Sequence, residues 1–156
     1  DVNWENWNDG DHYYKGAWVL HTLRHVLNYD EMWFDLLRGF YEYYAYSNVT
    51  TVDFVEYVQT CTAQDFSWFF EQYLEYPDIP TFQYQLEPQG EDLVLRYRWR
   101  ADVPDFRMPL MIGELGNYQM IFPTTEWQNI TLKKFRKQDF RVAKELFLTR
   151  SQQLTN

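Results

Sequence analysis

Residues 11–27 read DHYYKGAWVLHTLRHVL, and this stretch is the first of four segments that show the apolar period of an α-helix. Its apolar residues Ala17, Leu20, Leu23 and Leu27 recur at steps of three and four, which places them on one side of a helix. Similar patterns predict further helices over about residues 31–46, 51–60 and 66–76. The link after the first helix is short, so we expect the first two helices to form an antiparallel pair.

After Pro80 the period changes from that of a helix to that of a strand. Between Leu93 and Arg100 apolar and basic residues alternate, which is typical of a strand with one buried face. Residues 82–86 alternate likewise, and residues 88–91 form a plausible hairpin turn. Further strands are predicted over residues 109–115, 118–122, 127–132 and 140–148. We therefore predict an α+β fold, with a helical segment over residues 1–79 and a small antiparallel β-sandwich over residues 80–156.

Composition limits the function classes. Aromatic residues make up 21% of the 156 residues, which argues against disorder. The formal net charge of −9 disfavours a nucleic-acid partner, because binding to phosphates needs basic side chains. No apolar run approaches the roughly 20 residues of a membrane span. The first residue, Asp1, is neither an initiator Met nor part of a signal peptide, so we expect an excised segment of a longer protein.

Four segments together resemble one enzyme family. The sequence Tyr-Tyr-Lys-Gly-Ala at residues 13–17 closely resembles the Tyr-x-Lys-Gly-Ala helix start of the aminopeptidase N family of zinc metallopeptidases. Residues 48–54, 69–74 and 106–112 resemble later segments of that family in the same order, although Tyr73 stands where many members have Trp. The resemblance covers roughly residues 11–150.

The resemblance implies a role for Tyr13. In this family the corresponding tyrosine lies near the zinc and donates its phenolic hydrogen to the oxyanion formed when zinc-bound water attacks a peptide carbonyl. The zinc ligands of the family lie upstream of this helix, so the resemblance implies a carboxyl-terminal fragment that begins in the last part of a thermolysin-like catalytic domain. We expect the parent enzyme to use zinc and to remove amino-terminal residues from peptides. Alone, the fragment is expected to bind no zinc, to be inactive, and to expose apolar helix surface that the missing upstream part covers.

The resemblance also assigns roles around Tyr13. It makes Tyr14 a packing residue, and we expect Lys15 to be solvated or ion-paired. The small residues Gly16 and Ala17 would let the helix approach a neighbouring element closely.

Other constellations favour structural roles. His21 and His25 have the i, i+4 spacing of a metal site, but Thr22 stands where a general base would lie, and no third ligand is identifiable. A structural pair is favoured. Cys61 lacks the His and Asn partners of a thiol protease. The arginines at 96, 98 and 100 form a basic stripe that is favoured as a solvated face, with an interdomain or partner contact as the alternative.

Two alternatives to the enzyme fragment stay open from sequence. The first is a non-catalytic α+β interaction module that binds a peptide, a glycan or a partner subunit through exposed aromatic residues. It explains the aromatic composition but not the order of the motifs. The second is a family member that has lost its zinc site and kept the scaffold.

Overall fold

The first half of the protein is helical. A computed structural model describes residues 11–155, and within them it contains four α-helices: α1 (Asp11–Leu27), α2 (Asp30–Tyr43), α3 (Thr51–Thr62) and α4 (Ser67–Leu74). These confirm the predicted helices. Helix α2 ends three residues early, since the chain after it turns and Tyr46 takes the left-handed conformation with φ 63°.

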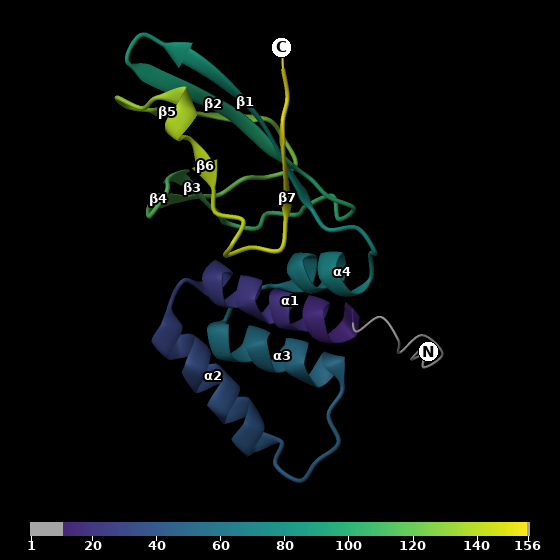
Figure 1. Cartoon of the computed structure of the whole chain (residues 1–156). Helices are drawn as coiled ribbons and strands as arrows, with labels where there is room; N and C mark the ends of the chain where they lie inside the picture. Colours follow the sequence, from purple (N-terminus) through teal and green to yellow (C-terminus); the bar gives the residue numbers. More distant parts are fainter. Residues whose placement is uncertain (1–10, 156) are drawn as a thin grey trace.

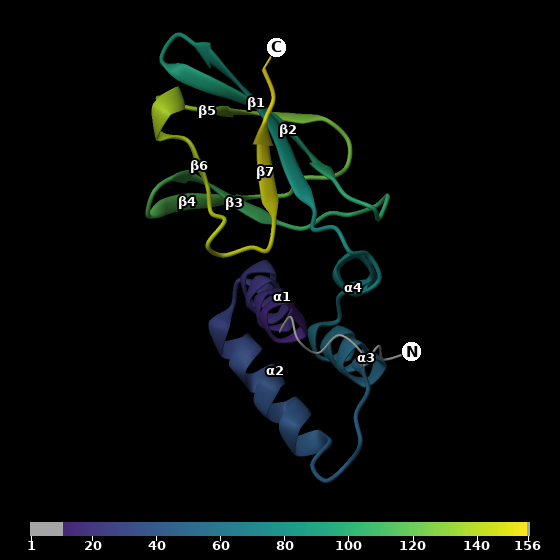
Figure 2. The ribbon, with the colours of Figure 1, turned by 45° about the vertical axis from the view of Figure 1, so that its right-hand side comes forward.

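Local signals set the ends of the helices. Helix α1 ends at Leu27, and the residue after it, Asn28, has a left-handed φ of 49°. Helix α3 begins with a capping box, in which Thr50 accepts a hydrogen bond from the Asp53 backbone and the Asp53 carboxylate accepts one from the Thr50 N–H at 2.7 Å. In Figures 1 and 2, α3 lies alongside α1, while α2 turns back from the end of α1 at a slant. The first two helices therefore cross rather than lie along one another.

The second half consists of two sheets. In the described part of the chain the strands are β1 (Thr81–Gln89), β2 (Asp92–Arg100), β3 (Leu110–Glu114), β4 (Asn117–Ile121), β5 (Gln128–Leu132), β6 (Arg141–Val142) and β7 (Arg150–Gln153). One sheet has the order β5-β2-β1-β7 and the other the order β4-β3-β6. Neighbouring strands are antiparallel except for β1 and β7, which are parallel. The predicted α+β fold, four helices followed by a β-sandwich, is confirmed.

One predicted strand is wrong for most of its length. Of residues 140–148 only Arg141 and Val142 form a strand, and the chain then turns toward the helices. The apolar residues that suggested a strand serve another purpose, because Phe147 is buried in the core from a turn. The true last strand, β7, has the sequence RSQQ. It lies at the edge of its sheet, and its polar residues do not alternate with apolar ones. The sequence pattern therefore did not predict this strand.

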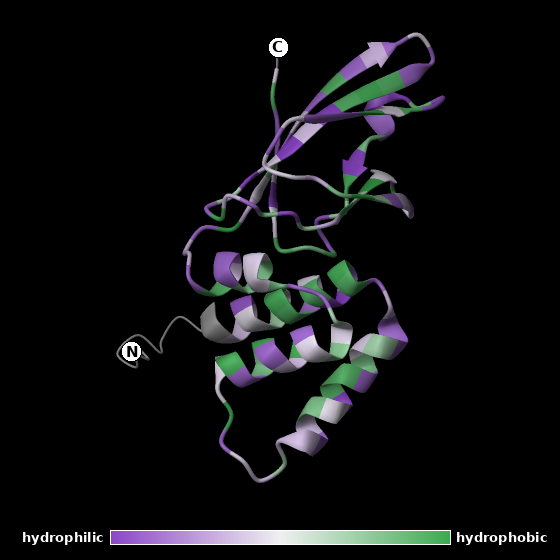
Figure 3. Cartoon of the chain, turned by 180° about the vertical axis from the view of Figure 1, so that it is seen from behind, coloured by the Kyte–Doolittle hydropathy of each residue, from purple (hydrophilic) through white to green (hydrophobic). Residues whose placement is uncertain are grey.

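The helices and the sheets share one hydrophobic core. Leu23, Val58 and Phe69 from the helices belong to the same buried cluster as Trp99 and Phe106 from the sandwich. Figure 1 shows the two sheets above a layer formed by α1 and α4, with α2 and α3 below it. In Figure 3, seen from behind, hydrophobic residues recur along each helix among hydrophilic ones. The proposed domain division at residues 79 and 80 stays a prediction.

The described residues include no helix that is both long enough and apolar enough to cross a membrane.

Candidate functional site

Tyr13 lies in the first turns of α1, on a side of the helix that the other described helices and strands do not cover. Its side chain is 71% exposed. Ala17 and Leu20 follow it at helical spacing and are exposed as well, although the sequence pattern placed them on one side of the helix with Leu23, which is buried. The open side of α1 therefore consists of Tyr13 followed by small and apolar residues. The predicted role of Tyr13 stays a prediction.

The neighbours of Tyr13 do not pack as the sequence suggested. Tyr14, expected to pack, is 73% exposed. A Cβ atom built on Gly16 would meet nothing within 4 Å, so the close approach expected of the small residues is not made to any described part of this chain. Lys15 is half-buried, and its Nζ donates a hydrogen bond to the Tyr76 carbonyl at 3.3 Å. This contact joins the start of α1 to the end of the helical half.

The opposite side of α1 is fixed to the sandwich by a buried threonine. Thr22 Oγ1 accepts a hydrogen bond from the Leu148 N–H at 2.8 Å and donates one to the Trp18 carbonyl at 2.7 Å. Both Thr22 and Leu23 are fully buried. Since one side of the helix is held in this way, the rotation of α1 is set and Tyr13 is directed away from the core. No periodic pattern predicted this anchor, whose only signal in the sequence is a polar residue beside the apolar positions of the helix.

The two histidines of α1 lie against the turn that follows β6. His21 Nε2 lies 3.1 Å from the Glu145 carbonyl oxygen, and the rings of His21 and His25 meet edge to face with centroids 4.6 Å apart. His25 also packs against the ring of Phe147. Within residues 11–155 no group of three His, Cys, Asp or Glu side chains is placed to hold a metal ion. The residues described do not fit a zinc site of their own, and the contacts give the histidines a packing role.

Acid is expected to destabilise the fold through His25. Burial, with a smaller effect from the nearby His21 and Arg24, lowers the pKa of His25 below its ordinary value near 6.5. The unfolded chain then binds the proton more readily, so stability is complete above about pH 6.5 and falls as the pH drops toward the lower pKa of the folded state. Urea denaturation at pH 7.5 and 5.5 should show a lower midpoint at pH 5.5, and His25→Leu should reduce that difference.

The two pH values and a control substitution separate the effect of His25 from that of the carboxylates and from a general loss of stability. Carboxylates ordinarily titrate near pH 4, so they contribute little between pH 7.5 and 5.5. The neighbouring substitution Val26→Ala should lower the midpoint by the same amount at both pH values. An unchanged pH dependence in His25→Leu would show that another group is responsible.

A second anchor joins α4 to the sandwich through Gln72, which is 0% exposed. Its Oε1 accepts hydrogen bonds from the backbone N–H groups of Asp102 at 2.8 Å and Val103 at 3.1 Å. Its Nε2 donates to the Asp78 carbonyl and to the Asp102 carboxylate, both at 3.1 Å. One amide thus uses its donors and acceptor to fasten the link before β1 and the turn after β2 to the helical half.

The adjacent Tyr73 is also buried. Its hydroxyl donates to the Leu148 carbonyl at 2.6 Å, and burial raises its pKa far above the ordinary value. The phenol therefore stays protonated and acts as a structural donor.

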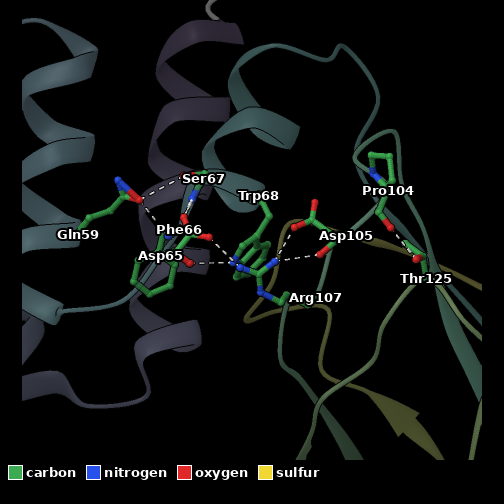
Figure 4. A network of polar contacts seen from close by, with 9 residues as sticks. All are labelled: Gln59, Asp65, Phe66, Ser67, Trp68, Pro104, Asp105, Arg107 and Thr125. Atoms are coloured by element: carbon green, nitrogen blue, oxygen red, sulfur yellow. Dashed lines mark hydrogen bonds and ion pairs between the residues drawn. The ribbon is translucent and has the colours of Figure 1, made fainter.

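A third connection surrounds Arg107, as Figure 4 shows. The guanidinium donates to the carboxylates of Asp65 at 2.9 Å and Asp105 at 2.7 Å, and it lies over the Trp68 ring at 5.3 Å. Hydrogen bonds from Ser67, with a smaller effect of Arg107, hold the pKa of Asp65 below its usual range. This ion pair spans the turn before α4 and the loop before β3. It supports the same orientation of helices and sandwich that presents Tyr13.

Comparisons with known proteins support the fold and give no direct sequence relative. No family model matches the chain, and no curated protein matches its sequence. Among solved structures, an aminopeptidase A from Legionella pneumophila, crystallised in complex with aspartic acid, is similar with a TM-score of 0.72 and 13% sequence identity. The match covers 96% of this chain and 18% of that chain, so this chain spans less than a fifth of the enzyme it resembles. The similarity is one of fold.

Proposed function

We propose that this chain is the carboxyl-terminal portion of a zinc-dependent aminopeptidase of the aminopeptidase N family, which removes amino-terminal residues from peptides. The observation that carries the proposal is the structural match to an aminopeptidase over 96% of the chain. The motif at residues 13–17 adds to it, because the side chain of its first tyrosine is exposed on α1. The structural match does not favour the alternative of a non-catalytic module.

The exposed apolar residues of α1 support the proposal that another part of the parent protein packs against this helix. A Cβ atom built on Gly16 would meet no described neighbour within 4 Å, and Ala17 and Leu20 are exposed beside it. Exposed apolar surface of this kind is typical of a surface that another element covers. We propose that the upstream part of the catalytic domain packs here, so that Tyr13 lies at the junction.

The proposed role of Tyr13 follows from the chemistry of a phenol. A phenol keeps its proton at neutral pH and can donate a hydrogen bond to an oxyanion. A donor placed where negative charge develops stabilises the transition state by about 3 kcal/mol. Zinc, when bound by the upstream part, would supply the activated water. This chain would contribute the donor and, through Thr22 and Gln72, its fixed position.

The proposal makes the chain inactive by itself. Among residues 11–155 no cluster of three metal-ligating side chains is present, and Tyr13 alone activates no water. The peptide substrate would therefore be bound and cleaved only after the upstream part is added.

The test is to read the coding sequence upstream of Asp1 and to express the extended protein. We expect an H-E-x-x-H motif with a later Glu, and zinc-dependent release of the chromophore from an aminoacyl p-nitroanilide. The 156-residue chain, incubated with the same zinc concentration, should release none. Hydrolysis by the short chain would overturn its inactivity, and an upstream sequence without the motif would overturn the assignment as an active zinc enzyme.

A further inference from the structure

The outward side of β2 carries positive charge that no carboxylate of the described residues neutralises. Because Leu95, Tyr97 and Trp99 are buried, the alternating residues Arg96, Arg98 and Arg100 face outward. Of the six other arginines in residues 11–155, five pair with aspartates, and these are Arg24, Arg38, Arg107, Arg136 and Arg150. The sixth, Arg141, donates to the backbone carbonyls of Gln138 and Phe140. The arginines of β2 have no carboxylate within 4.0 Å in the described part of the chain. The protein has 23 acidic and 14 basic residues, so the lack of a carboxylate partner for these three arginines among the described residues requires an explanation.

Neutral and aromatic groups hold Arg96 and Arg98 in place. Trp127 lies beside them, with the guanidinium carbons of Arg96 and Arg98 at 4.6 and 4.7 Å from its ring. Arg98 Nε also donates to Gln83 Oε1 at 3.0 Å, and Gln83 in turn donates to Gln152. The two side chains are ordered by these contacts while their charge stays uncompensated, so a ligand would find them already oriented.

A hollow beside Arg96 provides space for such a ligand. It has a volume of about 490 Å³ and is lined mainly by polar side chains, among them Gln85, Asn129, Lys137 and Gln153. Glu87 also lines it, and Lys137 supplies a second cation besides Arg96. The hollow lies next to the arginines and, like them, on the four-stranded sheet rather than on α1.

We propose that this surface, Arg96, Arg98, Arg100 and Trp127 with the adjoining hollow, binds an extended acidic peptide segment of a partner protein. Residues two apart on a strand are separated by roughly 6.6 Å, so carboxylates at alternate positions of an extended peptide match the spacing of the arginines. Guanidinium groups bind carboxylates through two parallel hydrogen bonds. The binding surface is independent of the proposed aminopeptidase activity.

A short peptide suits this surface better than a nucleic acid does. At physiological ionic strength charges are screened beyond about 8 Å, so a short acidic segment feels mainly the arginines that it contacts. A nucleic acid carries closely spaced phosphates over a longer contact, and these would meet the acidic remainder of a chain whose net charge is −9.

The test measures binding of a labelled peptide to the whole 156-residue chain by fluorescence anisotropy. The probe is a fluorescein-labelled eight-residue peptide that alternates Glu and Thr, and the reference probe has Gln in place of Glu. We expect the Glu probe to bind more tightly, and added salt to weaken it. Arg96→Gln combined with Arg98→Gln should weaken binding about tenfold, and Trp127→Leu about threefold.

The matched control combines Arg38→Gln with Arg136→Gln, which removes the same charge from exposed arginines elsewhere. It should leave the affinity within a factor of two. Circular dichroism melting curves establish that each variant is folded. Equal binding of the two probes, an equal loss in the control, or tighter binding of an eight-nucleotide oligothymidine than of the Glu probe would each overturn the proposal.

Discussion

In the extended enzyme, Tyr13→Phe should lower kcat about a hundredfold and leave KM nearly unchanged. The substitution removes one hydroxyl and keeps the ring, so packing at the start of α1 changes little. Under the proposed mechanism the hydroxyl donates only to the oxyanion of the transition state, and a donor of this kind contributes about 3 kcal/mol. An interaction made only in the transition state affects kcat rather than KM. Steady-state hydrolysis of an aminoacyl p-nitroanilide measures both constants.

The neighbouring Tyr14 offers a matched control. Tyr14→Phe makes the same chemical change one residue away, on a side chain that is equally exposed in this chain. It should leave kcat within a factor of two. Zinc content, measured by atomic absorption, should be the same in both variants. Full activity of Tyr13→Phe, or an equal loss in Tyr14→Phe, would contradict the role proposed for Tyr13.

The second large effect is expected at Gln72, where Gln72→Leu should reduce the free energy of unfolding by about 3 kcal/mol. Leucine has a similar size but forms none of the four hydrogen bonds of the amide. The Val103 N–H is buried and would lose its partner, together with groups of Asp78 and Asp102. A buried polar group without a partner costs free energy in the folded state. Urea denaturation followed by circular dichroism measures the change.

Gln64→Leu serves as the control for this substitution. Gln64 is exposed in the link between α3 and α4, close to Gln72 in the sequence. Its replacement should change the free energy of unfolding by less than about 0.5 kcal/mol, as is typical of surface positions. If both variants lost the same stability, the hydrogen bonds of Gln72 would not be the cause.

The sequence predicted the helices well because their signals are local. The apolar period over residues 11–27 and the capping residues Thr50 and Asp53 act within a few residues of each other. The hairpin of β1 and β2 follows from alternation for the same reason. Residues 140–148 were predicted wrongly, since burial of Phe147 from a turn produces the same apolar signal as a strand.

The sequence by itself determined the order of the helices and most of the strands, the outward position of the β2 arginines and the choice of Tyr13 as a candidate donor. The helices, the strands and the position of the arginines follow from the period of the apolar residues, and the choice of Tyr13 follows from a short motif. The tertiary structure alone decided which side of α1 is buried, because Ala17 and Leu20 have the same apolar character whether they are covered or open. It also assigned Thr22 and Gln72 their anchoring roles, since their hydrogen-bond partners lie 126 and 30 residues away. Contacts at such separations leave no periodic pattern in a single sequence, and they fix where Tyr13 is presented.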